Sequence, residues 1–470
     1  MSTLLAKNAQ ILVTMDAQRR EINNGALFIR DGMIELVGSS EELPGSADQV
    51  LDLSGQIVLP GFVNTHHHFD QTLTRAIPAA QELNLFPWLQ AHYRLWARRH
   101  PDASRTCTLI ALAELALSGC TTAFDHTYVF KNGSRIDDQI EAAREIGVRF
   151  HASRGSMSLG ESQGGLPPDE CVEKEEYILQ DCERVIQRYH DAAPGSMTRI
   201  VLAPCSPFSV TPELMTQSAA LARKHKVSLH THLCETLDEE RYTLERWGMR
   251  PVDYMESLGW VGPDVWYAHA IHVNDSEIAR FARWGCGVAH CPCSNMRLAS
   301  GIAPVRKYFD NGVKIGIGVD GSASNDGSHM LNEVRQAMLL ARLKIGLLPP
   351  EGPRSVLSTS HPLRRNEWMT ARQALEIATL GGAAVLGRND IGALEAGRCG
   401  DFFSLRLDSL EFAGGLHDPV ASTLFCSPQR AHYTVIHGKI VVDQGRLATV
   451  DLAPVIRAHN GHAEKMLQEI

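Results

Sequence analysis

The strongest constraint on the fold is an alternation of short apolar segments with helical segments between residues 60 and 387. Eight of the apolar segments are rich enough in β-branched residues to be strands that are buried on both faces of a parallel sheet. They are residues 62–65, 121–125, 148–152, 199–203, 227–231, 265–268, 287–290 and 313–319. Helical segments lie between them, for example residues 105–117, 177–189 and 212–224. Eight strands that are each followed by a helix predict an α/β fold, a (β/α)8 TIM barrel.

The two ends of the chain carry a different pattern. Short strand-like segments separated by turn signals fill residues 1–59, and similar segments recur within residues 388–470. Because chain termini often lie close together in space, we expect both ends to combine. We therefore predict a small β-sandwich built from residues 1–59 and 388–470, and a barrel over residues 60–387.

Composition narrows the range of partners. Lys and Arg number 45 against 54 Asp and Glu, which gives a formal net charge of -9. This balance provides no basic surface for nucleic acid and no attraction to anionic membranes, so we expect a small-molecule partner. The N-terminus lacks a signal-peptide pattern, and no apolar run reaches the roughly 18 residues of a membrane span, which predicts a cytoplasmic protein. No C-x-x-C pair occurs among the eleven cysteines, so we expect no disulfide scaffold.

Histidines and a carboxylate stand at the ends of four predicted strands. His66 and His68 end the first strand, and their spacing of two puts both imidazoles on one face. His232, His269 and Asp320 end the fifth, sixth and eighth strands. The C-terminal strand ends of a TIM barrel carry its active site. A histidine-rich surface loop and single core histidines are the alternatives, and the agreement of four strand ends favours a shared site.

Neutral imidazoles and a carboxylate are typical ligands of zinc or iron. Three imidazoles and one carboxylate leave a position open for a water molecule, whose pKa the metal lowers to near neutrality. Glu235, three residues after His232, is placed to move protons, and His269 can hold the water or a developing oxyanion. The fourth strand, residues 199–203, contains no lysine that could form a carbamate between two metals. A single metal is therefore favoured.

These residues resemble the motifs of the amidohydrolase superfamily, in its mononuclear aminohydrolase branch. The resemblance extends over nearly the whole chain. It rests on the segments PGFVNTHHH at 60–68, HLCE at 232–235, AH at 268–269, AHCPCSNMRLASG at 289–301 and GVDG at 318–321. It implies metal ligands at His66, His68, His232 and Asp320, and catalytic roles for Glu235, His269 and Asp320. It also implies one divalent metal, usually zinc and sometimes iron.

Four residues are expected to contact the substrate. Gln71 and Arg154 offer hydrogen-bond donors in fixed geometry that suit a carbonyl or amide edge of a heterocycle, with ordinary loop structure as the alternative. Trp88 lies in an insertion, residues 73–101, that we expect to form a lid or wall of the barrel mouth. Cys205 follows the fourth strand, where simple packing is the alternative.

Together with the segment NLFPWL at 84–89, Gln71 and Arg154 make the chain most similar to the 8-oxoguanine deaminases within that branch. The resemblance implies hydrolytic deamination of a purine-like ring, most specifically of 8-oxoguanine to urate and ammonia. The alternatives are an isoxanthopterin, pterin or guanine-type deaminase, a triazine hydrolase that releases chloride or an alkylamine, and a barrel that has lost catalysis. Barrels of this family often pair, so the resemblance also implies a homo-oligomer.

Overall fold

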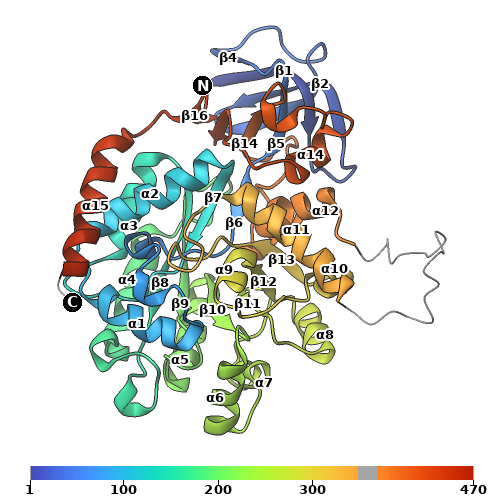
Figure 1. Ribbon diagram of the computed structural model, residues 1–470. Coiled ribbons are helices and arrows are strands. Elements are labelled where there is room, and N and C mark those ends of the chain that lie inside the picture. Colours follow the sequence, from blue (N-terminus) through green and yellow to red (C-terminus); the bar gives the residue numbers. More distant parts are fainter. Residues whose placement is uncertain (1, 348–367, 469–470) are drawn as a thin grey trace, which may run out of the picture.

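A closed barrel of parallel strands forms the centre of the protein (Figure 1). The computed structural model describes residues 2–347 and 368–468, and eight strands close the barrel within them. They are β6 (Phe62–Asn64), β7 (Cys120–Asp125), β8 (Arg149–Ser156), β9 (Thr198–Pro204), β10 (Ser228–Leu233), β11 (Val265–His269), β12 (Gly287–His290) and β13 (Lys314–Ile317). Each overlaps one predicted strand, and neighbours in the chain are neighbours in the barrel. The prediction of a (β/α)8 barrel is confirmed.

Helices surround the barrel and the C-terminal ends of its strands (Figure 1). They are α1 (Leu85–Ala97), α2 (Ala103–Leu117), α3 (Ile136–Ile146), α4 (Glu175–Tyr189), α5 (Pro212–His225), α6 (Leu237–Trp247), α7 (Pro251–Ser257), α8 (Asp275–Trp284), α9 (Pro292–Arg297), α10 (Val305–Asp310), α11 (Met330–Gly346), α12 (Ala371–Glu376) and α13 (Gly382–Val385). Local sequence sets their ends. Asn274 and Glu277 form a capping box at the start of α8, and Gly285 ends it at φ 73°. Within residues 2–347 and 368–468, no helix has the length and apolar character that crossing a membrane requires.

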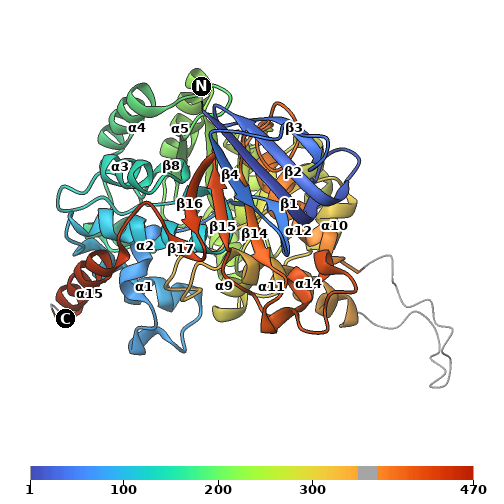
Figure 2. The same ribbon diagram turned by 90° about the horizontal axis from the view of Figure 1, so that it is seen from above.

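Strands from both ends of the chain form one mixed sheet that lies above the barrel in Figure 1 and faces the viewer in Figure 2. Nine strands of the described residues belong to it: β1 (Thr3–Val13), β2 (Glu21–Arg30), β3 (Met33–Ser39), β4 (Gln49–Asp52), β5 (Gln56–Pro60), β14 (Phe402–Arg406), β15 (Tyr433–Ile436), β16 (Lys439–Asp443) and β17 (Arg446–Leu447). Antiparallel pairing of β5 with β14 joins the two ends. The sheet encloses its own apolar cluster, which includes Leu12, Phe402 and Val435. The expected combination of the termini is confirmed.

Two further helices follow β14. The first, α14 (Pro419–Phe425), precedes β15, and the second, α15 (Leu452–Gln468), ends the described chain. In Figure 1, α15 runs along α2 on the outside of the barrel, away from the sheet. The proposed division of the chain at residues 59/60 and 387/388 stays a prediction.

An apolar layer fills the barrel beneath the C-terminal strand ends. Side chains of alternate strand positions point inward and pack together, among them Val63, Phe124, Val201, Trp266 and Ala289. All five are at most 1% exposed. The layer supports the strand ends from below and keeps water out of the barrel.

A buried ion pair joins the barrel to the terminal sheet. Arg149, at the start of β8, donates to the carboxylate of Asp401, just before β14, and the two side chains are 0% and 2% exposed. Asp401 also accepts the backbone N–H of His437 at 2.7 Å, and Nε of Arg149 donates to the carbonyl of Ser196 at 3.2 Å. Because both charges are removed from water, each depends on the other for its stability in the fold.

Replacing Arg149 by leucine should lower the free energy of unfolding by about 3–5 kcal/mol, because Asp401 would stay buried without its counter-charge. The matched control is Arg105→Leu, which breaks a pair with Glu145 whose side chains are 50% and 40% exposed. We expect a cost of at most ~1 kcal/mol for the control. Urea unfolding of both variants measures the difference, and equal losses would contradict the assignment.

Candidate active site

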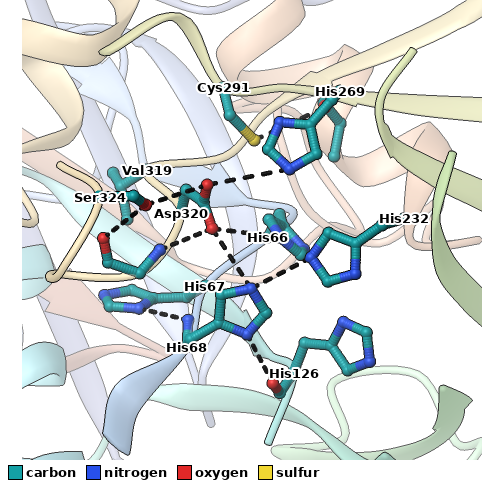
Figure 3. Close-up of polar contacts among 12 residues, drawn as sticks. His66, His67, His68, His126, His232, His269, Cys291, Val319, Asp320 and Ser324 are labelled. Atoms are coloured by element: carbon teal, nitrogen blue, oxygen red, sulfur yellow. Dashed lines mark hydrogen bonds and ion pairs between the residues drawn. The ribbon is translucent and has the colours of Figure 1, made fainter. Parts of the chain in front are cut away.

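The four predicted metal ligands meet at the C-terminal end of the barrel, as Figure 3 shows. Nε2 of His66 and Nε2 of His68 each lie 3.3 Å from Oδ1 of Asp320. Nε2 of His68 is 3.2 Å from Nε2 of His232. All four residues are at most 9% exposed. Ligand atoms bound tetrahedrally to zinc at about 2.0–2.1 Å are separated by roughly 3.3 Å, so these distances suit a single metal.

Hydrogen bonds on the far side of the rings leave the converging nitrogens free of protons. Nδ1 of His68 lies 2.6 Å from the carbonyl oxygen of His126, and Nδ1 of His232 lies 2.7 Å from that of Cys205. A carbonyl only accepts, so Nδ1 carries the proton and Nε2 keeps its lone pair. Nε2 of His66 is buried and has no hydrogen-bond partner among the described residues, as expected of a nitrogen whose partner is a metal.

Burial keeps the imidazoles in the form that binds metal. It lowers the pKa of His68 to about 3 and holds the pKa values of His66 and His232 below the usual range. For Asp320, burial alone would raise the pKa, but the neighbouring His66, His269 and His68 hold it well below its usual value. Neutral imidazoles around an ionised carboxylate are the protonation states that a divalent metal requires.

Glu235 and His269 face each other beside this cluster. Nε2 of His269 lies 3.4 Å from Oε2 of Glu235 and 3.8 Å from Oδ2 of Asp320, and its Nδ1 lies 2.9 Å from Oδ1 of Asn295. Burial raises the pKa of Glu235 to about 7. Burial would lower the pKa of His269, but Glu235, Asp320 and Asn295 together raise it above its usual value. A carboxyl with a pKa near 7 can take up and release a proton at neutral pH.

The backbone is strained where these side chains are presented. Cys234, His269 and Asp320 have φ values of 55°, 70° and 62°, in the left-handed region that residues with a Cβ atom rarely adopt. Each such conformation costs about 1–3 kcal/mol and persists where the surrounding structure enforces it. Three of them at three strand ends fit a site that is built for function.

His126 was not among the predicted site residues. Two overlapping groups of side chains are close enough to hold a metal: His66, His68, His126 and His232, and His66, His269 and Asp320. The ring of His126 stacks on that of His232 at 4.9 Å, and its Nε2 donates to the carbonyl of Ala203 at 2.8 Å. The signal in the sequence is its position directly after the second strand, β7. His66 is common to both groups, so both point to one place.

A pocket opens onto the cluster. Its walls include Leu85, Trp88, Leu89 and Tyr93 from α1, which is the insertion that was expected to form a wall. Its floor includes His68, His232, Glu235, His269 and Asp320. Gln71 and Cys205 also line it, so three of the four expected substrate contacts lie at the pocket.

Arg154 is absent from the pocket lining among the described residues. Its guanidinium donates to Glu173 at 2.9 Å and to Asp181 at 2.6 Å, and it lies over the ring of Phe130 at 4.2 Å. Arg154 does not reach the pocket because β8 extends to Ser156, which places Arg154 within the strand and not at its end. The charge of Arg154 is neutralised in a buried ion-pair network with Glu173 and Asp181, away from the pocket.

Three polar atoms of pocket-lining residues have no hydrogen-bond partner among the described residues: Oε1 of Gln71, Nε1 of Trp88 and the hydroxyl of Tyr93. Leaving a buried polar atom unpaired costs free energy that a polar ligand would recover. Tyr93 was not among the predicted substrate contacts. It stands among several aromatic residues of the same insertion, and pattern alone does not tell which of them faces the pocket.

Comparisons with known proteins identify the family of the chain. The sequence model of the amidohydrolase family matches residues 57–441. The chain is 47% identical over 446 residues to the 8-oxoguanine deaminase of Pseudomonas aeruginosa, which covers 94% of this chain and 95% of that protein. It is 35% identical over 488 residues to an isoxanthopterin deaminase from an unknown prokaryotic organism, covering 100% of this chain and 97% of that protein.

Among solved structures, the atrazine chlorohydrolase of Arthrobacter aurescens TC1, complexed with zinc, superimposes with a TM-score of 0.89 at 34% sequence identity. The match covers 98% of this chain and 100% of that one. Because the family match spans most of the chain and the relatives align over nearly its full length, the protein belongs to the amidohydrolase family.

Proposed function

We propose that the protein is a metal-dependent deaminase that hydrolyses 8-oxoguanine to urate and ammonia. The observation that carries the proposal is the floor of the pocket, where three of the four potential metal ligands, His68, His232 and Asp320, lie beside a carboxyl whose pKa is raised to about 7. Identity of 47% to an 8-oxoguanine deaminase favours this ring over other aminated heterocycles. The sequence-based predictions of a cytoplasmic location and a homo-oligomeric state stay predictions.

His66, His68, His232 and Asp320 would hold the metal, and their converging atoms fit it in distance and in protonation state. A divalent metal bound in such a site would lower the pKa of a water ligand from far above neutrality to about 7. We propose zinc over iron, since imidazoles with one carboxylate suit zinc and the similar chlorohydrolase was solved with zinc. Elemental analysis of the purified protein tests this, and iron as the main metal would contradict it.

Glu235 moves the protons of the reaction. As its carboxylate, it takes one proton from the attacking water and passes it to the ring nitrogen next to the carbon that bears the amine. The water oxygen bonds to that carbon and the second water proton goes to the amine. The bond between this carbon and the amine nitrogen then breaks, and the new carbon–oxygen bond becomes a carbonyl. One water is consumed, and a lactam and one ammonia are formed.

His269 stabilises the negative charge that develops on the oxygen of the attacking water. Its Nδ1 donates to Asn295 and its Nε2 faces Glu235 and Asp320 at the pocket floor. The raised pKa of His269 favours the doubly protonated ring, in which Nε2 also carries a proton to donate. A donor fixed before the reaction begins stabilises the developing oxyanion without reorganisation.

A panel of heterocycles tests the substrate. The purified protein is incubated with 8-oxoguanine, guanine, isoxanthopterin and amino- or chloro-substituted triazines, and the release of ammonia, chloride or alkylamine is measured. We expect ammonia from 8-oxoguanine with a kcat/KM at least ~100-fold above that of guanine, because a pocket with unpaired polar atoms discriminates against a ring that lacks their partners. Turnover of isoxanthopterin alone, or of a triazine alone, would replace the proposal with that activity.

Glu235→Gln should lower kcat by about 10²–10⁴-fold and leave the metal content unchanged, because the amide cannot exchange protons. The matched control is Glu245→Gln, on the exposed side of α6, which should retain full activity. Steady-state kinetics and elemental analysis are measured on both variants. Near-normal turnover by the Glu235 variant would remove this residue from the mechanism.

Tyr93→Phe should lower kcat/KM by about tenfold, because one hydrogen bond to the ligand is lost. Stability should not fall, since the hydroxyl has no partner among the described residues. Tyr254→Phe is the control. The hydroxyl of Tyr254 is also buried and has no hydrogen-bond partner among the described residues, but Tyr254 stacks on Trp247 and does not line the pocket. Equal kinetics for the two variants would show that Tyr93 does not contact substrate.

A further inference from the structure

His230 lies inside the barrel, one layer below the predicted metal ligands. It precedes His232 by two positions in β10, so both side chains point to the interior. It is 0% exposed and is packed between the rings of Phe124 at 4.7 Å and Trp266 at 4.8 Å. A polar ring in such an apolar layer is costly unless both of its nitrogens are hydrogen-bonded. No step of the proposed reaction uses it.

Both nitrogens of His230 have partners. Nδ1 lies 3.0 Å from the carbonyl oxygen of Trp266, and Nε2 lies 2.9 Å from Nδ1 of His66. A carbonyl only accepts, so Nδ1 of His230 carries a proton. A cation is strongly disfavoured at a position with no exposure to water, so the ring has only that one proton. Nε2 of His230 therefore accepts, and Nδ1 of His66 donates.

This hydrogen bond decides the state of His66. With its proton held on Nδ1, the ring leaves Nε2 bare, 3.3 Å from Oδ1 of Asp320. Backbone carbonyls impose the same tautomer on His68 and His232, and no substitution can remove a carbonyl. His66 is different because its Nδ1 meets a side chain. Its orientation can therefore be changed by a single substitution.

We propose that His230 is a positioning residue of the metal site, which accepts the Nδ1 proton of His66 and so fixes the tautomer and ring orientation in which Nε2 of His66 binds the metal. His230 cannot itself be a ligand in this arrangement, since its Nε2 is used by His66 and its Nδ1 by Trp266. The inference rests on the metal site of the proposed function, but it concerns metal binding and not the identity of the substrate.

Two substitutions separate the hydrogen bond from simple packing. His230→Leu fills similar space and offers neither donor nor acceptor. His230→Gln keeps one acceptor for His66 and one donor for the carbonyl of Trp266. Zinc affinity of the metal-depleted full chain is measured by competition with a chelator. We expect about a 10–100-fold loss of affinity in the leucine variant, and affinity within roughly threefold of the parent chain in the glutamine variant.

A matched control tests for general loosening of the barrel. His151 is also buried, at 2% exposure in β8, and it belongs to neither group of potential metal ligands. His151→Leu should leave zinc affinity unchanged. Full zinc affinity in His230→Leu, the same loss in His230→Leu and His230→Gln, or the same loss in His151→Leu would each overturn the proposal.

A measurement on the unsubstituted chain needs no variant to fold. In metal-depleted protein labelled with ¹⁵N-histidine, NMR should show a proton on Nδ1 of His66 and on Nδ1 of His230, and an Nδ1 without a proton in either ring would overturn the proposal. Failure of the proposed function is distinguished from failure here, because a chain that binds zinc as expected but deaminates none of the tested rings contradicts only the former.

Discussion

The site depends on the cost of burying imidazoles in a nearly dry barrel. A buried ring that lacks hydrogen bonds destabilises the fold. In each of these rings, the nitrogen that faces away from the centre of the site must therefore form a hydrogen bond with the protein. In doing so, His68 and His232 expose one lone pair each to the centre. The requirement of the fold and the requirement of a metal are thus met by the same hydrogen bonds, because satisfying one nitrogen of a neutral ring fixes the state of the other.

The same buried environment gives the carboxyl groups of Asp320 and Glu235 different pKa values and therefore different roles. Asp320 lies among three imidazoles, and its pKa stays well below the usual value in spite of its burial. Glu235 is as deeply buried, and its pKa rises to about 7 because burial raises it more than the neighbouring His269 lowers it. Nearby Glu239 accepts the backbone N–H groups of Cys234 at 2.9 Å and of Glu235 at 3.1 Å, which ties Glu235 to the start of α6. Neighbouring acids with separated pKa values are typical of a site that needs a ligand and a proton carrier at once.

Much of this arrangement could be predicted from the sequence because two periodicities are strict. Alternation along a strand puts His66 and His68 on one face, and parallel strands bring their C-terminal ends to one rim. The exact end of a strand, and what lies beyond it, follow no such rule. Arg154 was placed at a strand end because β8 was expected to stop at residue 152, and the strand continues to Ser156. Asn295, the partner of His269, lies in α9, beyond the reach of any strand pattern.

The division between rim and insertion also explains why the chemistry is easier to infer than the substrate. The rim is set by strand ends that the barrel cannot move without breaking its hydrogen-bonded ladder, so its residues can be assigned from position. The pocket wall comes from α1, an insertion whose inward side is decided by packing between Trp88, Trp96 and Tyr128. Such packing can change without altering the barrel. Relatives with the same fold can therefore act on different rings, and specificity has to be read from the polar atoms that the wall leaves unpaired.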